Sequence, residues 1–175
     1  MHHKNIVLIG FMGSGKSSVG RLIAAKLNQR FIDTDHLIIQ KNGLEISEIF
    51  KQHGESYFRD QERIALESLQ NSSHCVIATG GGIVVRPENH ALLHQLGFVV
   101  WLTANEEIIF ERVSRNTKRP LIQTENPRET ISNLLIQRNP LYDKAAHFTL
   151  DTSDYPHVSI AETIITEAQN YFNQL

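Results

Sequence analysis

The segment from Gly10 to Ser17, GFMGSGKS, places three glycines, a lysine and a serine directly after a short apolar run. The spacing matches G-x-x-x-x-G-K-[ST], the P-loop, which holds nucleotide phosphates. Glycines let consecutive backbone N–H groups approach an anion closely, and the start of the following helix adds partial positive charge. We expect Lys16 to reach the β- and γ-phosphates and the Ser17 hydroxyl to bind Mg²⁺. The residues expected to contact the nucleotide in this loop are Gly13, Ser14, Gly15, Lys16, Ser17 and Ser18.

Two carboxylates follow a second apolar run, in the string FIDTD. Ligands of open α/β sheets gather outside the carboxyl ends of the strands, so Asp33 and Asp35 can face the phosphates. Asp33 would hold a water on Mg²⁺, and Asp35 would orient an attacking hydroxyl or accept its proton. Capping of the next helix by Thr34 or Asp35 explains the same pattern equally well.

Three consecutive glycines, Gly80, Gly81 and Gly82, follow a third apolar run. Their bare backbone suits the close approach of a small ligand, although a tight turn would use the same residues. Arg59 and Arg138 lie in segments with helical periodicity, and no acidic residue in helical register is evident for both. Either arginine fits an exposed helix face. If they converge on the glycines, they form a bidentate clamp for a carboxylate.

The elements that must position these residues alternate between short apolar runs and longer amphipathic stretches, which predicts a parallel sheet with helical crossovers. We therefore expect an α/β fold with three layers, α/β/α, around a five-stranded parallel sheet. Residues 37–69 have helical periodicity without a strand, so a helical insertion of about residues 34–70 should stand beside the sheet. Residues 114–126 are polar and aperiodic, as expected of a mobile loop. The predicted strands are 5–9, 30–32, 75–79, 98–102 and 147–150, and the clearest helices are 17–28 and 156–172.

Length and composition indicate an ordinary globular protein. The 175 residues fit one domain, with 41% apolar and 21% charged residues. A net charge of −2 without blocks of like charge argues against a broad nucleic-acid or membrane surface. The single cysteine, Cys75, excludes an intramolecular disulfide and fits a reducing compartment. No apolar run approaches the roughly 20 residues that span a bilayer. We expect a cytoplasmic monomer.

Three other interpretations of the chain find less support in its residues. His90 and His94 have the i, i+4 spacing of zinc ligands on a helix, but no third ligand is evident, which favours a solvent-facing pair. A regulatory GTPase would need Asn-Lys-x-Asp and Asp-x-x-Gly, and neither string occurs in the chain. A bare ATPase module would have no use for the helical insertion and its arginine.

Six segments together resemble shikimate kinases in order and spacing: GFMGSGKSSVGRLIA, FIDTD, GESYFRDQE, TGGGIV, KRPL and QRNPLY. They extend over residues 4 to about 150, nearly the whole chain. The resemblance implies a P-loop kinase fold with a lid loop at about residues 114–126. It also implies phosphorylation of the 3-hydroxyl of shikimate by ATP with Mg²⁺, a step toward chorismate and the aromatic amino acids. A gluconate kinase, which shares the P-loop and the size, is the alternative.

The resemblance also implies roles for individual residues. Asp35 would contact the hydroxyls of shikimate, and Arg59 and Arg138 its carboxylate, beside the middle glycine Gly81. Lys16, Asp35 and Arg119 would be the catalytic residues, with Arg119, in KRPL, closing over the phosphates. Arg112 would stack on adenine, and Asp33 would act on Mg²⁺ through water. The chain departs from the common pattern in Ser18, where threonine is commoner, and in the acidic string DTSDYP, for which we name no adenine contact.

Overall fold

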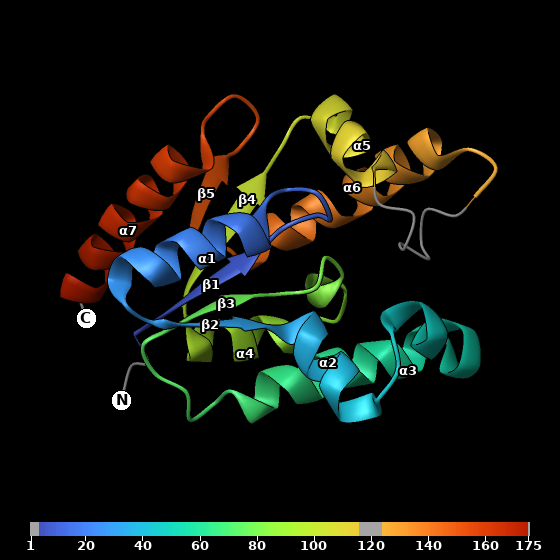
Figure 1. Cartoon of the computed structure of the whole chain (residues 1–175), viewed down its shortest axis with the longest axis horizontal. Helices are drawn as coiled ribbons and strands as arrows, with labels where there is room; N and C mark the ends of the chain where they lie inside the picture. Colours follow the sequence, from blue (N-terminus) through green and yellow to red (C-terminus); the bar gives the residue numbers. More distant parts are fainter. Residues whose placement is uncertain (1–3, 116–123, 175) are drawn as a thin grey trace.

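The computed structural model describes residues 4–115 and 124–174. In this part of the chain, five parallel strands form one sheet in the order β2-β3-β1-β4-β5 (Figure 1). The predicted fold class is confirmed, and each predicted strand overlaps an observed one, with bounds that differ by no more than one residue. The strands are β1 (Asn5–Ile9), β2 (Arg30–Asp33), β3 (Cys75–Ala78), β4 (Gly97–Thr103) and β5 (Phe148–Asp151).

Helices cover both faces of the sheet. One face carries α1 (Lys16–Leu27) and α7 (His157–Asn173), whose apolar side chains pack with Ile6, Leu8 and Val100. The other face carries α4 (Glu88–Leu96), α6 (Pro127–Ala145) and the end of α3 (Ile46–Ser68), with α5 (Glu106–Ser114) beside α6. The remaining elements are α2 (Thr34–Asn42) and the short 3₁₀ helix η1 (Ile83–Val85).

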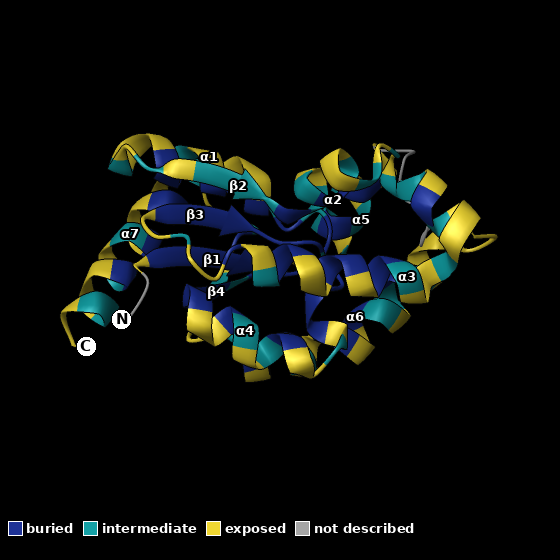
Figure 2. Ribbon diagram, turned by 90° about the horizontal axis from the view of Figure 1, so that it is seen from below, coloured by how far each residue is buried: buried dark blue, intermediate teal, exposed yellow. Residues whose placement is uncertain are grey.

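Burial of the central strands explains why they are almost entirely apolar in the sequence. All five residues of β1, NIVLI, and all four of β3, CVIA, are buried (Figure 2). A parallel sheet covered on both faces needs apolar side chains on both sides of each strand. Strand β2 lies at the edge of the sheet and is partly exposed, so its run of apolar residues in the sequence is shorter.

The predicted helical insertion consists of two helices, α2 and α3, which pack on each other beyond the end of β2 (Figure 1). The end of α2 is set by Gly43, whose backbone is left-handed with φ 66°. The predicted lid falls mainly on residues 116–123, which with Arg119 lie outside the described residues. Among the helices that are described, none has the length and apolar character needed to cross a membrane.

A buried asparagine ties the start of β1 to its neighbours. The Asn5 side chain is fully buried; its amide nitrogen donates to the carbonyls of Ser72 and Leu96, and its oxygen accepts from the N–H of Cys75. We expect Asn5→Ala to lower the free energy of unfolding by about 2–4 kcal/mol, because three hydrogen bonds are lost and buried backbone groups lose their partners. Urea unfolding measures this loss. The adjacent exposed residue provides the control, since Lys4→Ala should change stability by less than about 0.5 kcal/mol. Equal stability of both variants would contradict the expectation.

Candidate active site

The loop between β1 and α1 has the geometry of a phosphate cradle. Gly15, the residue before α1, is left-handed with φ 94°, a conformation that favours glycine. The Lys16 side chain is buried, and its Nζ donates to the carbonyls of Gly10 and Phe11 at 2.8 Å each. The ammonium group is therefore held within the loop, beside the N-terminus of a helix that favours anions.

A cavity of about 380 Å³ opens over this loop. It brings together most of the residues predicted to bind nucleotide, together with both aspartates that follow β2. Ser14 is buried and is not among the residues that line the cavity. The lining residues are Met12, Gly13, Gly15, Lys16, Ser17, Ser18, Asp33, Asp35, Thr79, Gly81, Arg112 and His157.

Two oxygen-bearing side chains meet at the mouth of the loop. The Ser17 hydroxyl donates to Asp33 Oδ2 at 3.0 Å, and Asp33 Oδ1 accepts from the backbone N–H of Asp35 at 3.1 Å. Asp33 is therefore the N-cap of α2, rather than Thr34 or Asp35. Capping and facing the cavity are compatible, because one carboxylate oxygen does each. Thr34 is buried and accepts instead from the N–H of Gly80 at 3.2 Å.

The two predicted arginines converge on the triglycine segment from different helices. Arg59 of α3 is 5% exposed and Arg138 of α6 is 4% exposed, so neither lies on a solvated face. Arg138 Nη1 donates to the carbonyl of Gly81 at 3.2 Å. A Cβ atom built on Gly82 would lie 1.9 Å from Arg59 Nη1, so only glycine leaves room for this guanidinium. Both guanidinium groups therefore lie against the backbone of the three glycines, Arg138 through a hydrogen bond and Arg59 through close packing.

Two carboxylates pair with Arg59, and sequence reasoning missed them. Glu55 and Glu62 each lie 2.7 Å from a guanidinium nitrogen, at the i−4 and i+3 positions of α3. Burial opposes the charge of the guanidinium, but Glu62 and Glu55 together raise the pKa of Arg59 above its ordinary value. The signal was visible in GESYFRDQE, where both glutamates stand in helical register with the arginine.

A buried tyrosine was also missed. The Tyr142 hydroxyl donates to the same Gly81 carbonyl as Arg138, and its ring stacks on Trp101 with centroids 5.7 Å apart. Burial raises the pKa of Tyr142, while the neighbouring Arg138 opposes that rise. Tyr142 thus stays protonated and fixes the carbonyl of the middle glycine. It lies one helical turn after Arg138 in the string QRNPLY, which is the sequence signal for the contact.

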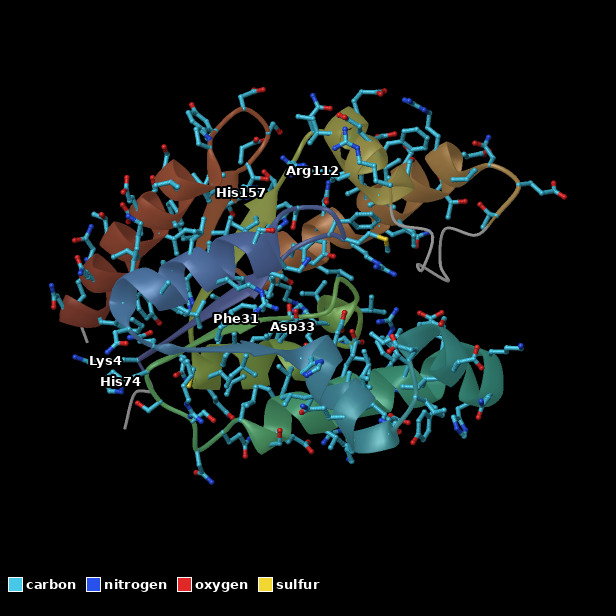
Figure 3. The ribbon with its side chains drawn as sticks, in the orientation of Figure 1. Lys4, Phe31, Asp33, His74, Arg112 and His157 are labelled. Atoms are coloured by element: carbon cyan, nitrogen blue, oxygen red, sulfur yellow. The ribbon has the colours of Figure 1, made fainter. Side chains whose placement is uncertain are left out.

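The far wall of the cavity comes from α5 and from the first residue of α7. Figure 3 shows Arg112 and His157 on one side of the phosphate loop and Asp33 on the other. Arg112 donates to the carbonyls of Gly13 at 3.0 Å and Thr152 at 3.4 Å. Thr152 is fully buried, and its hydroxyl oxygen lies 3.1 Å from the carbonyl oxygen of Ser14 and 2.9 Å from that of Thr103, so its single proton is shared between the two. The wall is therefore bonded to the phosphate loop itself. His157 was not predicted, and no sequence pattern pointed to it.

The two histidines with zinc-like spacing take part in backbone contacts instead. His90 Nε2 lies 3.1 Å from the carbonyl of Val84, and His94 Nε2 lies 2.9 Å from that of Ala145. His94 is exposed, as predicted, whereas His90 is half-buried. Within residues 4–115 and 124–174, no group of three His, Cys, Asp or Glu side chains could hold a metal.

Comparison with known proteins decides the family. Residues 12–169 match the family profile described as shikimate kinase, and they span most of the chain. The chain belongs to the shikimate kinase family. A shikimate kinase from Thermodesulfovibrio yellowstonii is 49% identical over 170 residues, which cover 97% of this chain and 98% of that protein. One from Caldanaerobacter subterraneus is 43% identical over 162 residues, 93% of this chain and 94% of the relative.

Solved structures agree with this family membership. A shikimate kinase from Acinetobacter baumannii, determined in complex with shikimate, superposes with a TM-score of 0.92 at 39% identity, covering 95% of this chain and 93% of that one. A gluconokinase from Sinorhizobium meliloti reaches a TM-score of only 0.56 at 19% identity, covering 97% and 96%. That second likeness shows a shared fold alone, so the comparisons favour shikimate kinase over the gluconate kinase alternative.

Proposed function

We propose that this member of the family uses ATP to phosphorylate the 3-hydroxyl of shikimate, giving shikimate 3-phosphate and ADP. The observation that carries the proposal is the convergence of Arg59 and Arg138, both buried, on a glycine segment whose middle residue lines the phosphate-loop cavity. Two guanidinium groups beside one short backbone segment suit an anionic acceptor, because they can hold a carboxylate through paired hydrogen bonds. Family membership supports the same acceptor.

In this proposal, different residues bind the phosphates and the acceptor. Lys16 would offset charge on the β- and γ-phosphates, and Asp35 would orient the attacking hydroxyl or accept its proton. Arg59, Arg138 and the backbone of Gly80, Gly81 and Gly82 would hold the acceptor. Because the transition state of phosphoryl transfer is loose, alignment and charge stabilisation account for most of the rate. Arg119 is proposed to add positive charge over the phosphates, within a lid of about residues 114–126.

The oxygen donors near the loop suit magnesium. Ser17 Oγ and Asp33 Oδ2 are 3.0 Å apart and both residues line the cavity, as expected for a hard cation that keeps several waters. We propose that Ser17 binds Mg²⁺ directly and Asp33 through a water. The ion would supply further neutralisation of the phosphate charge.

The remaining assignments concern the nucleotide base and the whole chain. Arg112 is proposed to stack on adenine, since its guanidinium is held over the cavity by two backbone carbonyls. We further propose that residues 1–175 work as one kinase domain, with the insertion of about residues 34–70 binding the acceptor. A monomer in the cytoplasm, without nucleic-acid or membrane partners, fits the balanced charge of the chain.

An acceptor panel tests the function. ADP release should be measured by a coupled assay with ATP, Mg²⁺ and shikimate, gluconate or no acceptor. Turnover with shikimate should exceed both other conditions by at least about 10³-fold. Gluconate also carries a carboxylate, but its flexible open chain would not hold a hydroxyl rigidly in line with the γ-phosphate, and water without an acceptor is not aligned by the arginines at all. Equal rates with gluconate, or with water alone, would overturn the proposal.

Gly82→Ala tests whether the triglycine segment positions Arg59. The new methyl group would lie 1.9 Å from Arg59 Nη1, so the guanidinium must move. We expect the KM for shikimate to rise by at least about tenfold, which corresponds to losing part of one charged hydrogen bond. The KM for ATP should stay within about twofold of its original value, since Gly82 does not line the nucleotide cavity. A variant with unchanged KM for shikimate would show that Arg59 does not bind the acceptor.

A further inference from the structure

Glu62 is a buried carboxylate at the edge of the proposed acceptor pocket. Its exposed fraction is 0%, and Oε2 accepts from Arg59 Nη1 at 2.7 Å. The other oxygen, Oε1, is also buried and has no hydrogen-bond partner among the residues that the structure describes. A carboxylate with one unsatisfied buried oxygen is costly, so this side chain needs an explanation beyond helix packing.

Charged groups from three helices face Glu62. Arg59 comes from its own helix α3, Asp35 from α2, and Arg138 with the hydroxyl of Tyr142 from α6. Glu55 acts on it indirectly, because it shares the Arg59 guanidinium. The two acidic groups meet at one point of the backbone. A Cβ atom built on Gly80 would lie 2.7 Å from both Asp35 Oδ1 and Glu62 Oε1, so the two oxygens approach the same Cα.

These neighbours place the protonation equilibrium of Glu62 near neutrality. Burial raises the pKa of Glu62 to about 7, although Arg59 and Arg138 lower it, and Asp35 adds to the rise. A small change in the local charge therefore shifts its protonation state at ordinary pH. The arrival of one more negative charge at Arg59 and Arg138 is such a change, because those two cations keep Glu62 ionised.

We propose that binding of the acceptor's carboxylate is coupled to the uptake of one proton by Glu62, which makes Glu62 a positioning residue for Arg59. This inference rests on the proposed function. The ionised Glu62, a solvent proton and the anionic acceptor combine to give a complex with a neutral Glu62, and no bond within the acceptor changes. The proton occupies Oε1, while Oε2 still accepts from Arg59. Arg59 is then free of one full negative charge and pairs more strongly with the acceptor.

A pH dependence of a defined sign follows. Glu62 is mostly ionised in the free protein above pH 7, so binding must draw a proton from an increasingly dilute supply as the pH rises. The Kd for shikimate should increase above pH 7, by up to about tenfold per pH unit. Below pH 7, Glu62 is already neutral in the free protein, and the Kd should level off.

Isothermal titration calorimetry measures the proton directly. Shikimate is titrated into the full chain at pH 8 in Tris and in HEPES, whose ionisation enthalpies differ, and the difference in binding heat gives the number of protons taken up. We expect an uptake of about 0.5 to 1 proton per shikimate bound. Clear binding with no difference between the buffers would overturn the inference and leave the proposed function standing. Absence of binding heat in both buffers would instead count against the proposed function.

Matched substitutions assign the proton to its residue. Glu62→Gln keeps the shape and an oxygen for Arg59 but cannot titrate, so the uptake should fall below about 0.2 proton and the Kd should lose its pH dependence. Glu55→Gln removes the other carboxylate from Arg59, but from a half-exposed side chain (52%), and should retain the uptake. Glu62→Asp restores a titratable group and should restore the uptake. Titration with ADP checks that each variant is folded. Full uptake in Glu62→Gln would overturn the assignment.

Discussion

Asp35→Asn should lower kcat for shikimate phosphorylation by about 10²- to 10⁴-fold, the range for loss of a positioned acid–base group. Asp35 lies in the first turn of α2, lines the same cavity as Lys16 and Ser17, and approaches Gly80 with Oδ1. Asparagine preserves the shape but removes the charge that aligns or deprotonates the hydroxyl. Steady-state kinetics at saturating ATP and shikimate measures the loss.

A matched control separates this effect from general loss of charge. Asp143 is exposed on α6 and does not line the phosphate-loop cavity, so Asp143→Asn should retain kcat within about twofold. If Asp35→Asn retained kcat and raised only the KM for shikimate, Asp35 would serve in binding alone.

Arg138→Ala has the second largest expected effect, an increase in the KM for shikimate of at least about 30-fold. Removing one partner of a buried, hydrogen-bonded charge pair typically costs 2–5 kcal/mol or more, and about 2 kcal/mol corresponds to 30-fold. Arg138 also lies over the Phe11 ring at 5.8 Å, so its loss affects packing as well. Arg138→Lys separates the two, because it keeps the charge but not the planar fork. We expect its KM to fall between those of the original protein and the alanine variant.

The selectivity of the same variant gives a readout that packing damage alone would not change. The original protein should favour shikimate over its carboxamide analogue by about 10²-fold or more, and Arg138→Ala should lose most of that preference. Normal affinity for shikimate in Arg138→Ala would contradict the carboxylate clamp.

The sheet could be predicted because burial on both faces demands apolar residues throughout each strand. Apart from Asn5, β1 and β3 are short apolar strings, and each ends at a motif that breaks the pattern, the phosphate loop after β1 and the glycines after β3. The phosphate loop could be predicted because backbone geometry alone requires its glycines. Gly15 in its left-handed conformation confirms that reason.

The proposed acceptor side could be predicted only in part, because it depends on contacts between distant helices. Periodicity places Arg59 and Arg138 on helices, yet a solvated face and a buried clamp require the same spacing. The choice depends on packing: both side chains are buried against the triglycine segment. Glu62 illustrates the same limit, since a glutamate three residues after an arginine is usually an exposed pair, and here it is 0% exposed.

The hydrogen bonds of Thr152 have a consequence for the order in which the chain acquires its properties on the ribosome. The phosphate loop leaves the exit tunnel early, but the hydroxyl that holds the Ser14 carbonyl belongs to residue 152, after the last strand. The Ser14 carbonyl therefore lacks this hydrogen bond for most of translation. We expect nascent chains that stop short of residue 152 to bind ATP poorly, so nucleotide affinity should emerge as one of the last steps of biosynthesis.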